Sequence, residues 1–140
     1  MTSDNANKKV AAIVVTFNRK NLLLKNIHSL LKQSFPVDHI FIIDNASTDG
    51  TADAVKNGLG NNRNITYIKL DKNIGSSGGF NRGLKRAYSW GADWFWILDD
   101  DVAPEPDCLE NLLNYQDISK CIHPSKKDIN GQEFIWEQKL

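Results

Sequence analysis

Three consecutive aspartates, Asp99 to Asp101, are the residues of this sequence best suited to chemistry. Carboxylates packed together raise one another's pKa unless something offsets their charge, and a bound cation is one such partner. In extended backbone, Asp99 and Asp101 point to one side and Asp100 to the other. The pair Asp99 and Asp101 could then hold Mg²⁺ or Mn²⁺ through oxygen, with phosphate and water completing the shell. The alternative is a solvated acidic turn.

A glycine-rich stretch over residues 73–79, Asn-Ile-Gly-Ser-Ser-Gly-Gly, is the second such feature. Glycines let the backbone approach a ligand closely, and the N-terminus of a helix expected from about Phe80 favours an anion. Arg82 would lie in the first turn of that helix and could pair with a phosphate. The alternative is a flexible connection. The spacing matches neither the dinucleotide-binding G-x-G-x-x-G pattern nor the phosphate loop, which disfavours a dehydrogenase or a P-loop ATPase.

Four apolar runs predict the strands that would position these residues, at 10–15, 39–43, 65–70 and 94–98. The first two runs are continuous rather than alternating, which is typical of parallel strands buried on both faces. Apolar residues at helical spacing predict helices over about 23–31, 52–55, 80–90 and 106–113, with Asn18 as a cap and Pro106 at a first helical position. A hairpin over 129–136 with its turn at Asn130-Gly131 is a weaker prediction. The order predicts an α/β domain with a mostly parallel sheet flanked by helices.

Polar segments follow each predicted strand, at 16–19, 44–47, 73–79 and 99–101. Ligands of open α/β sheets bind beyond the carboxyl ends of the strands, so we expect these segments to form one site. Asp44 could accept hydrogen bonds from a base or ribose, or it could cap its own turn. Trp94 and Trp96 share one face of their strand and are interpreted as core. The isolated histidines are interpreted as structural or exposed, not as ligands; they are His28, His39 and His123.

The bulk composition bounds the function. The 140 residues fit one domain, with 1–9 as a polar tail and 10–140 as a single domain. Lys+Arg and Asp+Glu both number 17, so a basic excess for nucleic-acid binding is missing. Cys108 and Cys121 lack metal-ligand spacing and are expected to be free thiols in a reducing compartment. The run 10–15 is too short to span a bilayer, so we expect a cytoplasmic location, with peripheral attachment at the inner face of the membrane left open.

Four ordered motifs resemble the family 2 glycosyltransferases of GT-A fold, whose nucleotide-binding half is Rossmann-like. They are Val-Val-Thr-Phe-Asn-Arg (14–19), Ile-Asp-Asn-Ala-Ser-Thr-Asp-Gly-Thr (43–51), Asn-Ile-Gly-Ser-Ser-Gly-Gly-Phe-Asn-Arg-Gly (73–83) and Trp-Ile-Leu-Asp-Asp-Asp (96–101). The glycine-rich motif together with the aspartates is most similar to the galactofuranosyl- and rhamnosyltransferase-like branch. The resemblance covers about residues 10–115 and is specific to the family rather than to a sugar.

The resemblance implies roles for these motifs. A nucleoside-diphosphate sugar, UDP- or dTDP-linked, would be the donor, and a glycan, lipid-linked glycan or protein hydroxyl the acceptor. Asp44 would contact the uracil or thymine, and Asp99 and Asp101 would bind Mn²⁺ or Mg²⁺ as the family's Asp-x-Asp motif. The implied nucleotide-sugar-binding residues are Thr16, Phe17, Asn18, Asp44, Asn45, Asn73, Gly75, Gly78, Gly79, Arg82, Asp99 and Asp100. Attack from the opposite face by an acceptor deprotonated by a carboxylate would invert the anomeric configuration.

The general base is the part of the family's pattern that this sequence lacks. Glu133 and Glu137 follow the aspartates but sit in no convincing motif, and His123 lies too close to them for the family's later metal ligand, so no base is assigned. We therefore expect a piece of a longer enzyme, truncated on its acceptor side, whose exposed apolar surface would favour homo-oligomers. The alternatives are a nucleotide-sugar-binding module without turnover and a metal-dependent phosphohydrolase or nucleotidyltransferase.

Overall fold

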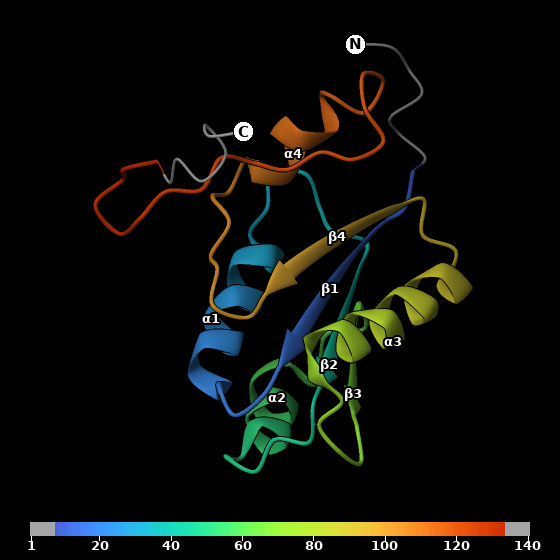
Figure 1. Cartoon of the computed structure of the whole chain (residues 1–140), viewed down its shortest axis with the longest axis vertical. Coiled ribbons are helices and arrows are strands. Elements are labelled where there is room, and N and C mark those ends of the chain that lie inside the picture. Colours follow the sequence, from blue (N-terminus) through green and yellow to red (C-terminus); the bar gives the residue numbers. More distant parts are fainter. Residues whose placement is uncertain (1–7, 134–140) are drawn as a thin grey trace.

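The computed structural model describes residues 8–133, in which four strands alternate with four helices (Figure 1). The strands are β1 (Val10–Thr16), β2 (His39–Asp44), β3 (Ile65–Lys69) and β4 (Trp94–Asp99). The helices are α1 (Lys20–Leu31), α2 (Thr51–Leu59), α3 (Gly75–Trp90) and α4 (Cys108–Leu113). The alternating order predicted from the apolar runs is confirmed, and each strand ends within one residue of its expected limits.

The four strands form one all-parallel sheet in the order β3-β2-β1-β4. The chain moves from β1 to β2 on one side, whereas β4 pairs with β1 on the other, so the strand order reverses beside β1. Thr16 is paired with Asp44 and Val15 with Asp99, which brings the carboxyl ends of the three strands level. A crevice at such a reversal is where open α/β sheets bind ligands. The predicted α/β class is confirmed.

Helices cover both faces of the sheet (Figure 1). On one face, Leu23, Ile27 and Leu30 of α1 pack with residues of α2 against the apolar side chains of β1 and β2. On the other face, α3 packs its Ala87, Phe80 and Leu84 against a second cluster from the same strands. The helical stripe expected on α1 is confirmed for its buried members, although Leu31 at its end is exposed.

Glycines bring α3 close to the sheet. A Cβ atom at Gly83 would lie 2.3 Å from Cγ2 of Ile13, and one at Gly79 would lie 2.6 Å from Cγ1 of Val15. Both distances are shorter than carbon atoms tolerate, so only glycine allows this helix to pack directly on β1. The need for glycine at these two positions therefore comes from packing inside the domain.

The start of α3 corrects one prediction. The glycine-rich stretch was expected to be a loop with a helix from about Phe80, but the helix begins at Gly75. Gly75 has a φ of +76°, a conformation that side chains disfavour, and its N–H donates to Oδ1 of Asn73 at 2.8 Å. Packing against the sheet outweighs the poor helix propensity of glycine here. Arg82 is consequently the eighth residue of the helix and not part of its first turn.

Three further predictions, on the starts of two helices and on the hairpin, differ from the structure. Helix α1 begins at Lys20, and Asn18, with φ of +52°, accepts a hydrogen bond from Thr48 N–H instead of capping it. Helix α4 begins at Cys108, so Pro106 precedes the helix within a turn. The hairpin is reduced to an isolated antiparallel bridge between Lys127 and Glu133, and its remaining residues, 134–136, lie outside the described residues.

Strand β4 forms one edge of the sheet, and its aromatic residues are half-buried. Trp96 packs against the core on the α1 and α2 face, which confirms its interpretation as a core residue, and Trp94 is half-buried on the same strand. The two cysteines are free thiols, as expected. Across residues 8–133, no helix has the length and apolar character needed to cross a membrane.

Candidate functional site at the carboxyl edge of the sheet

The end of β1 is joined to the acidic turn, residues 99–101, at the carboxyl edge of the sheet. The hydroxyl of Thr16 donates a 2.6 Å hydrogen bond to Oδ2 of Asp100, and both side chains are buried. Strand β4 ends at Asp99, so Asp100 and Asp101 lie in a turn. The extended backbone assumed for residues 99–101 is therefore wrong beyond Asp99, because Asp100 turns inward while Asp99 and Asp101 stay exposed.

Arg19 is the cation that faces this turn. Its Nη1 lies 3.3 Å from Oδ1 of Asp100 and 3.2 Å from Oδ2 of Asp101. The two oxygens of Asp100 are thus held by Thr16, the last residue of β1, and by Arg19, whereas the ion pair with Arg19 is the one polar contact of the Asp101 side chain among the described residues. A guanidinium placed between two carboxylates offsets the repulsion between their charges. Sequence analysis noted Arg19 only as part of a polar segment.

Asn26 holds the backbone of the acidic turn from α1. Its Nδ2 donates to the carbonyl of Asp99 at 3.2 Å and to that of Val102 at 2.8 Å. The side chain is buried, and its Oδ1 has no hydrogen-bond partner among the described residues. Just beyond the end of α1, Gln33 accepts from Leu109 N–H and donates to the carbonyl of Glu105. The segment after β4 is therefore fixed at two points, one on α1 and one just beyond it.

The loop after β1 is tied to the loop after β2. The N–H of Asn18 donates to the hydroxyl of Ser47 at 2.8 Å, and its Oδ1 accepts from Thr48 N–H at 2.7 Å. These contacts hold the backbone of Asn18 in its left-handed conformation. Phe17, one residue earlier, keeps an exposed aromatic ring at this edge. The pair provides one ring and one amide beside the crevice.

Asp44 is completely buried, and both of its carboxylate oxygens have partners. Oδ1 accepts from the Ser47 N–H at 2.8 Å, and Oδ2 accepts from the hydroxyl of Tyr67. Burial and this hydrogen bond raise the pKa of the Tyr67 hydroxyl above its usual range, so it remains a donor. The geometry is that of the turn-capping alternative, and a contact from Asp44 to a base stays a prediction.

Asn45 connects β2 to the start of α3. Its Nδ2 donates to the carbonyl of Gly75 at 3.1 Å, and its Oδ1 accepts from Ile74 N–H at 3.4 Å. Asn73 and Gly75 are exposed here, Gly78 is half-buried, and Gly79 is buried against β1. The N-terminus of a sixteen-residue helix therefore reaches the same edge as the acidic turn, with the partial positive charge that favours anions.

The chain matches one protein family over most of its length. The family model of Glycosyl transferase family 2 matches residues 11–139. The chain belongs to this family. The galactofuranosyltransferase GlfT1 of Mycolicibacterium smegmatis is 35% identical over 106 residues, which are 75% of this chain and 34% of that protein. This family 2 chain thus spans about a third of the length of the curated relatives that it matches.

Two solved structures have the same fold. The mannosyltransferase PcManGT from Pyrobaculum calidifontis, in complex with GDP-Man and Mn²⁺, has a TM-score of 0.70 and 26% identity, covering 79% of this chain and 33% of that one. S. aureus TarS 1–349, in complex with UDP, has a TM-score of 0.67 and 26% identity, covering 79% of this chain and 32% of that one. The resemblance to GT-A structures drawn from the motifs is confirmed.

Arg82 and the three described histidines of this family 2 domain lie apart from the acidic turn. Arg82 is exposed and lies about 10 Å along α3 from its first residue, at 1.5 Å per residue. His28 is exposed on α1, and His123 is exposed with Nδ1 3.1 Å from the Pro124 carbonyl. His39 stacks near Phe41 and bonds to Thr66 through Nε2 at the amino end of β2. The interpretation of the histidines as structural or exposed agrees with these positions.

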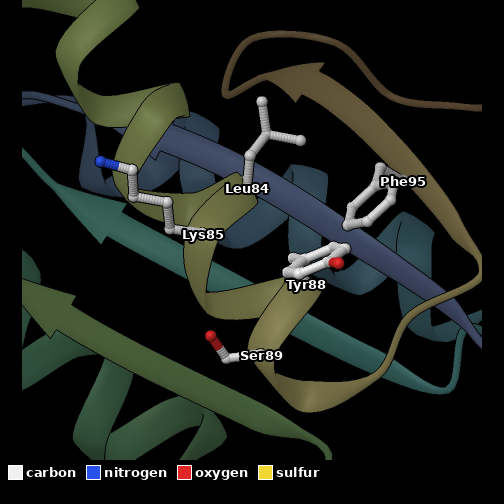
Figure 2. Close-up of a pocket in the computed structure, with 5 residues that line it drawn as sticks. All are labelled: Leu84, Lys85, Tyr88, Ser89 and Phe95. Atoms are coloured by element: carbon white, nitrogen blue, oxygen red, sulfur yellow. The ribbon is translucent and has the colours of Figure 1, made fainter.

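A hollow of about 470 Å³ lies on the family 2 domain away from this edge. It is lined by Leu84, Lys85, Tyr88, Ser89 and Phe95, from the carboxyl-terminal half of α3 and the start of β4. Figure 2 shows Leu84, Tyr88 and Phe95 turned toward one another, with Lys85 and Ser89 directed away from them. None of the residues implied by the family's motifs lines this hollow.

The residues that hold the site's loops in place were not predicted from the sequence. Asp49 accepts from the N–H of Lys20 at 3.1 Å and from the hydroxyl of Thr51 at 2.5 Å, so it joins the first residues of α1 and α2. The Thr51 hydroxyl is the main cause of the lowered pKa of Asp49. An aspartate whose side chain accepts from the backbone N–H two residues on is a recognisable turn signal, whereas nothing local marks Asn26 or Tyr67.

Proposed function

We propose that this chain forms the donor-binding part of a glycosyltransferase that moves a sugar from a UDP- or dTDP-linked donor to a hydroxyl of a glycan or lipid-linked glycan. The observation that carries the proposal is the hydrogen bond from Thr16 to Asp100. It supports the proposal because it joins the end of β1 to the acidic turn at the carboxyl edge where the strand order reverses, which is where open α/β sheets bind their ligands.

The donor's base fits beside the β1–α1 connection. Phe17 offers an exposed ring for stacking, and Asn18 lies next to it with its backbone fixed by Ser47. Asn45 is bonded to the start of α3, whose N–H groups would favour the diphosphate. The complexes of a structural neighbour, S. aureus TarS 1–349, with UDP and with UDP-GlcNAc support this class of ligand.

A divalent metal fits the chemistry of the acidic turn. The carboxylates of Asp99 and Asp101 are exposed oxygen donors, and Mg²⁺ is commonly held by one or two carboxylates together with substrate phosphates. Within residues 8–133, no group of three or more His, Cys, Asp or Glu side chains is placed to hold an ion, so the two aspartates alone would bind one weakly. The donor's phosphates would therefore complete the shell. When bound, Mn²⁺ or Mg²⁺ would supply charge neutralisation for the departing diphosphate.

The chain's own residues would orient the donor for an inverting displacement. Thr16 and Arg19 hold Asp100 so that the turn keeps its shape, and Asn26 fixes the turn's backbone. The start of α3 would bind the diphosphate and leave the anomeric carbon open to an acceptor hydroxyl from the far side. The base that removes the acceptor's proton stays unassigned: Glu133 lies on the bridge with Lys127, and Glu137 lies outside the described residues.

Calorimetric titration of the chain with UDP, dTDP and UDP-linked sugars, with and without Mn²⁺, tests the proposal. We expect binding that requires Mn²⁺ and that Asp101→Asn weakens at least about tenfold, since one charged ligand of the ion is removed. Asp117→Asn is the matched control, because Asp117 is an exposed carboxylate that follows α4 and is not part of the acidic turn. A chain that prefers a nucleoside triphosphate to every diphosphate sugar would contradict the proposal.

The same samples distinguish a transferase from the alternative, a binding module without turnover. The absence of an assigned base motivates it, and the assay is donor hydrolysis and sugar transfer after binding has been measured. Mn²⁺-dependent binding without release of free sugar would identify the binding module, whereas turnover at an enzymatic rate would identify a complete transferase.

A further inference from the structure

Arg19 differs from the other residues that hold the acidic turn, because its side chain is exposed whereas those of Thr16 and Asn26 are buried. Its Nη1 serves both Asp100 and Asp101, at 3.3 and 3.2 Å, and its side chain is 53% exposed. The Thr16 contact with Asp100 is shorter, at 2.6 Å, and buried. Exposed ion pairs contribute little to folding, so the pair with Asp101 can exchange partners at small cost.

The two aspartates that Arg19 touches also differ from each other. Asp100 is buried, and Thr16 holds its second oxygen, so it stays in place when Arg19 leaves. The side chain of Asp101 is 48% exposed, and its one polar contact among the described residues is the ion pair with Arg19. Asp101 is therefore the carboxylate that can pass from the guanidinium to an incoming cation.

A guanidinium and a divalent ion cannot share one carboxylate face without strong repulsion. Arg19 is the residue just before α1, at the edge where β1 ends, so its side chain stays at this edge after leaving Asp101. Arginine presents a planar fork of N–H groups that pairs well with phosphate oxygens. The displaced side chain would thus lie where the donor's diphosphate is expected.

We infer that Arg19 exchanges partners during donor binding, pairing with Asp101 before the donor arrives and with the donor's diphosphate once a divalent ion has taken Asp101. This inference rests on the proposed function and deepens it by making Arg19 a positioning residue for metal and donor. Its consequence is that Arg19 opposes binding of the metal alone and favours binding of metal and nucleotide together.

Arg19→Gln separates the two effects, since it removes the charge and keeps most of the side chain's length. Binding of Mn²⁺ alone, followed by calorimetry or by the electron paramagnetic resonance signal of free Mn²⁺, should become about two- to fivefold tighter, the range that an exposed ion pair allows. Binding of UDP in saturating Mn²⁺ should become at least about threefold weaker. Arg19→Lys keeps the charge and should leave Mn²⁺ binding close to wild type.

Lys25→Gln is the matched control, because it removes one exposed cation from α1 without touching the aspartates. It should change neither affinity by more than about twofold. Thermal unfolding of each variant confirms that the fold is kept. Arg19→Gln binding both ligands more weakly would show a merely structural residue and overturn the inference, as would unchanged binding of either ligand. Failure of the wild-type chain to bind UDP under any condition would instead overturn the proposed function itself.

Discussion

The hydroxyl of Thr16 and the carboxylate of Asp100 meet at 2.6 Å although 84 residues separate them in the chain. The contact joins the last residue of β1 to the turn after β4, at the edge where the strand order reverses. Because both side chains are buried, the hydrogen bond satisfies a carboxylate oxygen that water does not reach. The same contact supports the fold and fixes the shape of the acidic turn.

Thr16→Val tests this dual role, since valine keeps the shape of the side chain and removes its donor. We expect the free energy of unfolding to fall by about 1–3 kcal/mol, because one oxygen of the buried Asp100 loses its partner. Urea denaturation followed by circular dichroism measures the change. Thr16→Ser restores the hydroxyl and should recover most of the loss, and equal stabilities of the valine and serine variants would contradict the interpretation.

Gly83→Ala and Gly58→Ala are expected to change stability in opposite directions. At Gly83 the added methyl would lie 2.3 Å from Cγ2 of Ile13, and this overpacking should cost about 1–3 kcal/mol. At Gly58, inside α2, the methyl would meet only Cδ2 of Leu24 at 3.8 Å, and alanine should stabilise the helix by about 0.5–1 kcal/mol. Thermal unfolding of the two variants side by side gives the signs. A destabilising Gly58→Ala would show that helix propensity does not govern that position.

The strands and the location of the site could be predicted because both depend on local pattern and topology. Continuous apolar runs mark buried parallel strands, and parallel strands place their following segments at one edge. That reasoning placed Thr16, Asp44 and the aspartates at a common edge, which the pairing of Thr16 with Asp44 and of Val15 with Asp99 bears out for the backbone. The pattern was sufficient for the common edge because all the strands are parallel, whereas the strand order, with β4 beside β1, did not follow from it.

The contacts within the site could not be predicted, because they join residues far apart in the chain. Arg19 meets Asp101 across 82 positions and Asn26 meets Val102 across 76, and neither residue type is unusual where it stands. The prediction of a loop over the glycine-rich stretch was wrong for a related reason. Its composition favours a loop, yet Gly79 and Gly83 allow α3 to pack on β1, and that packing extends the helix back to Gly75.

His39 should make the stability of the domain fall in mild acid. Burial lowers the pKa of its imidazole, so the folded state binds fewer protons than the unfolded state. Stability is therefore complete above the unfolded pKa of about 6.5 and decreases as the pH falls through that value toward the lower folded pKa. Urea unfolding at pH 7.5 and 5.5 measures the difference. His39→Gln should reduce it and the exposed His28→Gln should not, and the same pH dependence in all three proteins would contradict the assignment.

Tyr67→Phe should destabilise the domain through Asp44, whose carboxylate is 0% exposed and takes one hydrogen bond from the Tyr67 hydroxyl. Removing that donor leaves a buried oxygen without its partner and should cost about 1–3 kcal/mol of unfolding free energy. Tyr88→Phe is the matched control, since Tyr88 is 76% exposed and should change stability by less than about 0.5 kcal/mol. A double-mutant cycle with Asp44→Asn should give a coupling free energy above about 0.5 kcal/mol, and additive effects would show that the two side chains do not stabilise each other.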